Sequence, residues 1–183
     1  MRTFVAVFPP PEIREALASA ARDLPVLGKV RFTDPANLHL TLKFLGDIPQ
    51  DDLDRVVQVL EPIRERHEPF EAAISAFGAF PSPRRARILW AGIGEGADRL
   101  RALAQDVERT LEPPCPVRED RVYVPHLTVG RARGRPVTLQ ATKTSPPVPA
   151  FSVSNVELMK SVLGKSGAVY STLVTYPLSE SRD

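Results

Sequence analysis

Two histidines in this chain each stand two positions before a threonine, in the segments HLTL and HLTV. The first segment holds His39 and Thr41, and the second holds His126 and Thr128. The chain has only three histidines, so two such spacings have a chance probability on the order of 1%, which is low for a short motif. An imidazole titrates near neutral pH, and two of them with neighbouring hydroxyls are suited to moving protons around a phosphate.

Strand alternation predicts how the first motif is oriented. Residues i and i+2 of a β-strand share a face, so His39 and Thr41 project together while Leu40, Leu42 and Phe44 project into the core. The same alternation applies to the second motif. Each motif is then either the solvent face of an amphipathic strand or, if both strands line one cleft, half of a site with two imidazoles and two hydroxyls.

Such a site would perform acid–base chemistry on a phosphoester. A neutral histidine takes a proton from the attacking water or hydroxyl, and a protonated histidine gives one to the leaving oxygen, each transfer contributing about 10² to 10⁴ in rate. Threonine hydroxyls can donate hydrogen bonds to phosphate oxygens. A Ser–His–Asp triad is not indicated. We expect no metal and no cofactor, because the sequence has no HxH, HxxxH or cysteine cluster.

Composition limits the class of protein and its location. The formal net charge is +2, from 24 basic and 22 acidic residues, which does not favour sequence-blind nucleic-acid binding. Cys115 is the only cysteine, so an internal disulfide is excluded and a reducing compartment is favoured. The apolar run before Pro9 is too short for a signal peptide, and no stretch is long enough for a membrane span. We therefore expect a cytoplasmic protein without a membrane partner.

The order of elements predicts an α+β fold with largely antiparallel sheets. Helices are expected at 11–24, from Val56 to Ile63 with a kink or end at Pro62, and at 95–111. Strands are expected at 4–8, 29–33, 38–46, 69–80, 86–93, 121–131, 151–163 and 168–178, with a loop or ragged edge at 134–150.

The element order also repeats weakly, with one His-x-Thr strand in each half of the chain. We interpret residues 1–183 as a single bilobal domain of two intertwined α+β lobes. Two antiparallel sheets would line a central cleft, and helices would lie on the outside. A monomer is the default expectation.

The chain resembles the 2H phosphoesterase superfamily, and within it the bacterial and archaeal RNA 2′,3′-cyclic phosphodiesterases, historically called 2′-5′ RNA ligases. The resemblance runs nearly end to end, through FVAVFPP, NLHLTLKFLGD, FGAFPSPRRARILWAGI, VPHLTVGRAR and LMKSVLGKSGAVYSTLVTYPL. It implies that His39 and His126 are catalytic and that Thr41 and Thr128 bind the substrate phosphate. It also implies a bilobal fold with a cleft between the lobes and no required metal.

The activity implied by the resemblance is hydrolysis of 2′,3′-cyclic phosphate ends of RNA or small cyclic nucleotides to 2′-phosphates. By the family mechanism His126 would activate water and His39 would protonate the leaving oxygen, but the near-symmetric motifs do not assign these roles. The alternatives are 2′-5′ RNA ligase activity and a non-catalytic nucleotide- or RNA-binding module. The natural RNA and its base preference are not encoded in any recognisable pattern.

Two cations are further candidates for substrate contact. Arg131 follows HLTVG, but strict alternation turns it away from His126, so contact requires a twist or bulge at Gly130. Lys43 shares the parity of His39 and would lie at the next position along the cleft, or would end the strand in water.

Structural roles are favoured for several aromatic residues. Core packing is favoured over a cleft wall for Phe8, Phe44 and Phe80, and a core position is expected for Trp90. Structural roles are also expected for Ser161 and Tyr170, and a surface position is expected for the third histidine, His67.

Overall fold

The structure is a computed structural model that describes residues 1–112, 122–140, 145–164 and 167–179. The predicted α+β class is confirmed, since every strand pair in the described ranges is antiparallel. Cys115 lies outside the described residues. No helix in the described ranges is long and apolar enough to cross a membrane.

The helices contain the predicted apolar periodicities, although the second begins at Gln50, before the expected Val56. They are α1 (Pro11–Arg22), α2 (Gln50–Leu60), α3 (Ile63–Arg66) and α4 (Ala97–Leu111), with 3₁₀ turns η1 (Pro35–Asn37) and η2 (Pro83–Arg85). The break between α2 and α3 falls at Pro62, where a helix end was expected.

Most strands fall near their predicted positions, but β2 (Val26–Leu27) was not predicted and β9 (Thr138–Leu139) lies within the predicted loop 134–150. The strands are β1 (Arg2–Val7), β2 (Val26–Leu27), β3 (Val30–Phe32), β4 (Leu40–Asp47), β5 (Phe70–Ala72), β6 (Ile74–Phe80), β7 (Ile88–Ile93), β8 (His126–Ala132), β9 (Thr138–Leu139), β10 (Phe151–Val153), β11 (Asn155–Gly164) and β12 (Gly167–Pro177).

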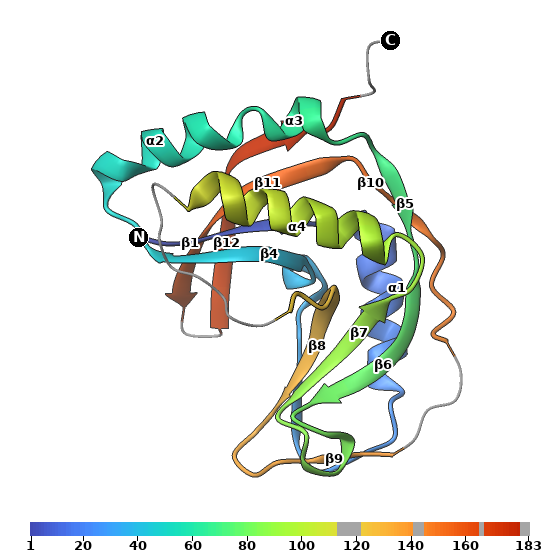
Figure 1. Cartoon of the computed structure of the whole chain (residues 1–183). Helices are drawn as coiled ribbons and strands as arrows, with labels where there is room; N and C mark the ends of the chain where they lie inside the picture. Colours follow the sequence, from blue (N-terminus) through green and yellow to red (C-terminus); the bar gives the residue numbers. More distant parts are fainter. Residues whose placement is uncertain (113–121, 141–144, 165–166, 180–183) are drawn as a thin grey trace.

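An eight-stranded sheet in two halves forms the centre of the molecule (Figure 1). One half has the order β12-β11-β1-β4, and the other has β8-β7-β6 with β3 also paired to β8. A single residue pair, Leu40 with Leu127, joins β4 to β8 and so connects the halves. The two sheets expected from the sequence are therefore continuous at one point. Two further two-stranded sheets pair β10 with β5 and β2 with β9.

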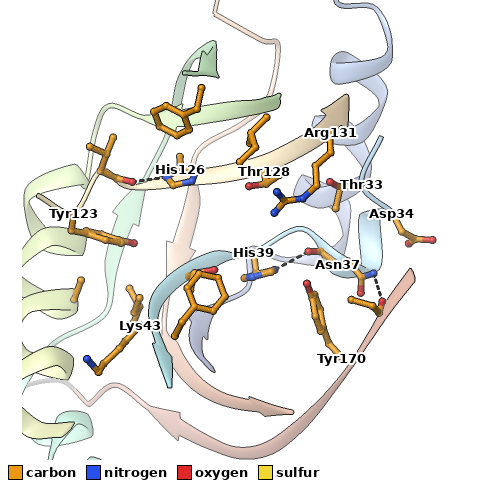
Figure 2. A pocket seen from close by; sticks show the side chains of 18 of the residues that line it. Thr33, Asp34, Asn37, His39, Lys43, Tyr123, His126, Thr128, Arg131 and Tyr170 are labelled. Carbon is orange, nitrogen blue, oxygen red and sulfur yellow. Dashed lines mark hydrogen bonds between the residues drawn. The ribbon is translucent and has the colours of Figure 1, made fainter. Parts of the chain in front are cut away.

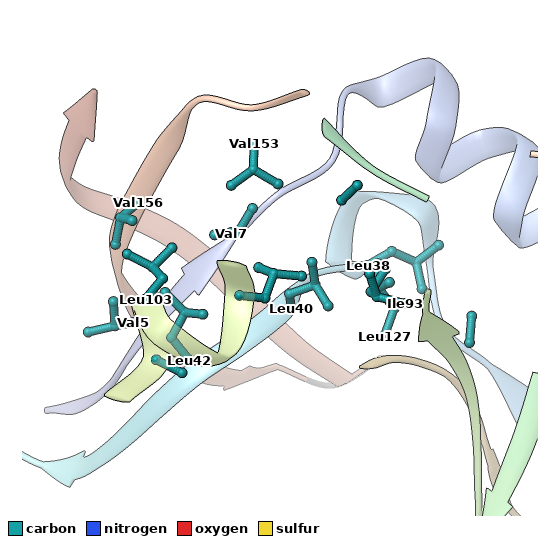
Figure 3. Packing of buried hydrophobic residues seen from close by; sticks show 14 of the residues in the cluster. Val5, Val7, Leu38, Leu40, Leu42, Ile93, Leu103, Leu127, Val153 and Val156 are labelled. Atoms are coloured by element: carbon teal, nitrogen blue, oxygen red, sulfur yellow. The ribbon is translucent and has the colours of Figure 1, made fainter. Parts of the chain in front are cut away.

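The core lies on the face of the sheet opposite to the histidine motifs. Leu40, Leu42 and Leu127 are buried there together with Leu103 of α4, as Figure 3 shows. Helix α1 packs against β3 and β8, and α4 packs against β4 and α2. Burying these apolar side chains fixes which way each strand faces, so the motif side chains that alternate with the leucines must project away from the core.

The halves of the sheet exchange chain segments. β11 and β12 come from the end of the chain and complete the half that begins with β1, while β3 comes from the beginning and pairs with β8. The assignment of residues 1–183 to a single bilobal domain of two intertwined α+β lobes stays a prediction.

Candidate active site

The Leu40–Leu127 pair brings the two His-x-Thr motifs together. Each leucine is the central residue of its motif, and both are fully buried. In an antiparallel pair centred on these leucines, His39 lies across from Thr128, and Thr41 lies across from His126. The two imidazoles and the two hydroxyls therefore share the face opposite to the core. The motifs cross with an approximate local twofold symmetry.

Each imidazole makes the same kind of hydrogen bond, to the backbone carbonyl oxygen two residues earlier in the chain. Nδ1 of His39 lies 2.8 Å from the carbonyl oxygen of Asn37, and Nδ1 of His126 lies 2.6 Å from that of Val124. A carbonyl oxygen only accepts hydrogen bonds, so Nδ1 donates in both residues. The neutral form of each histidine therefore has its lone pair on Nε2, which leaves this atom to exchange protons in the shared space (Figure 2).

Both motif strands contain an irregularity at the same motif position. Val5 and Ala6 of β1 pair with Lys43 and Thr41, so Leu42 has no partner on β1. Leu89 and Trp90 of β7 pair with Gly130 and Thr128 in the same way. Each strand thus carries one extra residue directly after its threonine, as in a β-bulge.

The irregularity in β8 turns Arg131 toward the histidines. The extra residue is Val129, one position before the glycine where a bulge was expected to be required. After it, Arg131 shares the face of His126 and lines the same hollow. Figure 2 shows its guanidinium reaching into the space above His39, and its charge is among those that act on the His39 imidazole.

The irregularity in β4 overturns two expectations. Lys43 does not continue the His39 face, because the extra residue Leu42 turns it toward α4, where Nζ lies 2.6 Å from a carboxylate oxygen of Glu108. Lys43 is 3% exposed, although it borders the hollow. Phe44, expected in the core, is 57% exposed and lines the hollow beside Phe4. A substrate contact by Lys43 stays a prediction without support from this geometry.

A single large hollow contains both motifs. Its volume is about 1640 Å³, and its lining includes His39, Thr41, His126, Thr128 and Arg131. The structure therefore brings the four motif residues and Arg131 around one space, as required for joint action on one substrate. Within the described ranges, no group of three or more His, Cys, Asp or Glu side chains is arranged to hold a metal ion.

The two imidazoles differ in their surroundings. The His39 ring is flanked by Phe4, Phe8 and Tyr170, with ring centroids 5.0, 5.3 and 5.2 Å away. Burial lowers the pKa of His39, and the charges of His126 and Arg131 lower it further, while the hydrogen bond to Asn37 acts in the opposite direction. Burial disfavours the charged imidazolium, so His39 favours its neutral form.

His126 lies in a more open part of the hollow. The ring of Phe80 meets it edge-on at 5.4 Å, and Trp90 lies 6.5 Å away. Phe80 lines the hollow, in contrast to its expected core position, and Trp90 is half-buried. The approximate symmetry of the motifs therefore does not extend to the residues around them.

Two tyrosines in the hollow were not identified as functional candidates from the sequence. Tyr170 was expected to be structural, but it lines the hollow beside His39. Tyr123 precedes the second motif, and its hydroxyl is buried without a hydrogen-bond partner in the described part of the chain. Figure 2 shows this hydroxyl pointing into the hollow below His126. Burial raises the pKa of both tyrosines, so both hydroxyls keep their protons and can donate.

The third histidine lies outside the hollow. His67 was expected at the surface, but its side chain is mostly buried, with Nε2 3.0 Å from a carboxylate oxygen of Asp106. Arg66 and Arg109 bind the same carboxylate. This cluster attaches the segment after α3 to α4, and of its members only Arg109 lines the hollow.

Comparisons with known proteins agree with the resemblance seen in the sequence. Residues 9–165 match the family model described as the 2'-5' RNA ligase superfamily. An RNA 2′,3′-cyclic phosphodiesterase of Methanothermobacter thermautotrophicus is 35% identical over 82% of this chain and 83% of its own length. A protein of the same name from Aquifex aeolicus is 30% identical over 97% of both chains.

Solved structures share the fold over nearly the full chain. The protein TT0787 of Thermus thermophilus superposes with a TM-score of 0.79 at 28% identity, covering 97% of this chain and 98% of that one. E. coli LigT complexed with 3′-AMP has a TM-score of 0.81 at 24% identity, covering 98% of both chains. The latter likeness concerns the fold alone.

Proposed function

The chain belongs to the 2'-5' RNA ligase superfamily, and from this premise we propose that it hydrolyses 2′,3′-cyclic phosphate ends of RNA or nucleotides to 2′-phosphates. The observation that carries the proposal is the Leu40–Leu127 pair, which sets both imidazoles over one hollow. The names of the relatives support the same reaction class. The expected cytoplasmic location and monomeric state belong to the same proposal.

The proposed chemistry uses the Nε2 atoms of the two histidines. One neutral imidazole takes a proton from water while the water oxygen forms a bond to phosphorus. The bond from phosphorus to the 3′ oxygen breaks, and the other imidazole, protonated beforehand, gives its proton to that oxygen. The products are a 2′-phosphate and a free 3′-hydroxyl. Each of the two proton transfers accelerates the reaction by a factor of about 10² to 10⁴.

Three neighbouring side chains would hold the phosphate during the reaction. Thr41 and Thr128 lie across from His126 and His39 at the crossing, where their hydroxyls can donate to non-bridging oxygens. Arg131 lines the same hollow and can bind two oxygens at once through its planar guanidinium. These donors would stabilise the negative charge on the phosphate oxygens as water attacks.

Two considerations assign the roles of acid and base to the histidines in opposite ways. The family resemblance implies that His126 is the base. The lowered pKa of His39 favours its neutral form, which is the form that a base requires. Both assignments use the same two residues, so the reaction proposed does not depend on which holds.

Replacing either motif histidine tests the proposal. We expect His39→Ala and His126→Ala each to reduce turnover of 2′,3′-cyclic AMP by about 10² to 10⁴, because each removes one proton transfer. His67→Ala removes a histidine outside the hollow and serves as the matched control. Turnover is measured by release of 2′-AMP with EDTA present, and circular dichroism checks folding.

The other outcomes separate the alternatives. Binding of the nucleotide without turnover by the wild-type protein would indicate a binding module. Joining of RNA ends without hydrolysis would indicate a ligase. Loss of turnover on adding EDTA would require a metal, and wild-type rates in either folded variant would contradict the two-histidine mechanism.

A further inference from the structure

Four basic side chains form a ladder along the pairing of β3 with β8. Arg31 is paired directly with Arg131, and the backbone N–H of Arg133 donates to the carbonyl oxygen of Lys29 at 2.8 Å. Residues opposite one another in an antiparallel pair share a face, and a step of two residues keeps that face. Lys29, Arg31, Arg131 and Arg133 are all exposed, and we call them the basic ladder.

The basic ladder opposes like charges. Positive side chains directly across from each other in a sheet are destabilising unless an anion lies between them. In the described part of the chain, none of the four forms an ion pair with a carboxylate. Asp34 also lines this side of the hollow, but it accepts a hydrogen bond from the N–H of Ala36 as the cap of η1.

The opposite side of the hollow has cations of a different kind. Lys43 is paired with Glu108, Arg101 with Asp98 and Arg109 with Asp106. The charges near α4 are therefore balanced within the protein, while those of the basic ladder are available to a ligand. The positive charge that no carboxylate balances in the described part of the hollow therefore lies on the side of β3.

The outer pair of the basic ladder borders a second hollow at the edge of the sheet. The smaller hollow has a volume of about 440 Å³ and is lined by Lys29 and Arg133, while Arg22 and Phe32 line both hollows. Among the described residues that line it, none is acidic. Consecutive pairs of the ladder are about 6.8 Å apart along the strand, which is comparable to the separation of neighbouring phosphates in an extended single strand.

Arg31 is also held in place by its neighbours. A side chain at Gly167 would begin only 2.3 Å from the Nη2 atom of Arg31, so the guanidinium packs closely on the β12 backbone. This packing against β12 therefore helps to fix the position of Arg31 beside the hollow. Arg131 reaches into the hollow from the opposite strand.

We propose that the basic ladder binds the phosphodiester groups of an RNA strand upstream of its cyclic end. This rests on the proposed function, and it adds that the protein acts on oligoribonucleotide ends in preference to cyclic mononucleotides. Arg131 would hold the reacting phosphate, the phosphate preceding the terminal nucleotide would lie beside Arg31, and the next one would lie between Lys29 and Arg133. These phosphates would neutralise the opposed cations.

Kinetics on two substrates test this proposal. We compare kcat/KM for 2′,3′-cyclic AMP with that for a short oligoribonucleotide ending in the same cyclic nucleotide. In Arg31→Gln, and separately in the double variant K29Q/R133Q, the ratio of kcat/KM for the oligoribonucleotide to kcat/KM for the mononucleotide should fall about tenfold. A plot of log kcat/KM for the oligoribonucleotide against log salt concentration should become shallower by a slope of about 1 for each cation removed. Arg55→Gln, on exposed α2, is the matched control and should leave both values unchanged.

A binding measurement separates failure of this proposal from failure of the proposed function. Fluorescence anisotropy of a labelled oligoribonucleotide with a 2′-phosphate end requires no turnover. The ladder variants should bind it about tenfold more weakly than the wild type and Arg55→Gln, and inorganic phosphate should compete poorly. Equal binding by all variants, an unchanged substrate ratio, or displacement by inorganic phosphate alone would overturn the proposal.

Discussion

His39 and His126 have the same backbone hydrogen bond but different surroundings. Phe4, Phe8 and Tyr170 enclose His39, while His126 contacts Phe80 edge-on in a wider space. Aromatic surroundings remove water from an imidazole and so disfavour its charged form. The lowered pKa of His39 thus depends on residues outside the motif.

The pKa of His39 can be tested by NMR. We expect its imidazole to titrate below the ordinary value of about 6.5, because burial lowers its pKa. Phe8 stacks on the ring, so Phe8→Ala should admit water and move the pKa of His39 back toward the ordinary value. The measurement is the pH dependence of the His39 ring resonances, assigned with His39→Asn.

The same shift gives the stability of the protein a pH dependence. Between the lowered pKa of folded His39 and about 6.5, the unfolded chain binds more protons at this residue than the folded chain does. Stability contributed by neutral His39 is therefore complete above about 6.5 and is lost as the pH falls through the folded pKa. A pKa of His39 at or above the ordinary value would contradict this account.

At the scale of elements, the crossing of β4 and β8 is the feature on which the site depends. Only the pair Leu40–Leu127 joins these strands, so the relative placement of the two imidazoles is sensitive to packing at this point. Small displacements of catalytic groups can lower rates strongly even when a protein remains folded.

Truncating one leucine of the crossing tests this dependence. Leu127→Ala should reduce the free energy of unfolding by about 2–5 kcal/mol and should lower kcat by about tenfold to a hundredfold. Leu60→Ala in α2 is the matched control, because Leu60 is equally buried and the main contacts of α2 are with α4 and not with either motif strand. Urea unfolding should give similar losses for both variants, while a similar loss of kcat in both would argue against a special role for the crossing.

The sequence predicted the elements and the faces of the motif residues better than it predicted irregularities. Leu40, Leu42 and Leu127 are buried as alternation requires. The extra residues at Leu42 and Val129 have no local signal, since a bulge depends on the register of the neighbouring strand. For this reason Lys43 and Phe44 were placed on the wrong faces. For Arg131, in contrast, a bulge was recognised as a requirement for contact and lies one residue away.

The lining of the hollow by tyrosines could not be predicted from the sequence for a related reason. Tyr170 belongs to β12, and its place beside His39 depends on the order β12-β11-β1-β4. Tyr123 lies outside any strand. A pattern of periodicity reports which residues face a core, but it contains no information about which distant strand completes a site.

At the scale of the whole molecule, the exchange of segments makes the halves interdependent. β1 has β4 on one side and β11 on the other, and β8 takes partners from β3, β4 and β7. Neither half of the sheet can be completed by one continuous part of the chain. The molecule should therefore unfold as a unit.

A truncated chain tests this interdependence. A fragment ending at Leu111 lacks the partners of β1 and β3 that β11 and β8 supply. We expect it to lack a cooperative thermal transition, because the exposed strand edges and the unpaired core face would not be stabilised. Differential scanning calorimetry of the fragment and of the full chain provides the comparison, and a sharp transition in the fragment would show that the first half folds by itself.

The near-twofold crossing at Leu40 and Leu127 also bears on regiochemistry. A symmetric pair of imidazoles has no intrinsic preference between the two ester oxygens of a cyclic phosphate, so the bond that breaks must be selected by how the ribose rests against unlike walls. Among the described lining residues, Tyr170 lies on the His39 flank and Phe80 lies on the His126 flank. Redesigning the flanks while keeping the motif intact is thus the route by which this scaffold could be made to yield the opposite isomer.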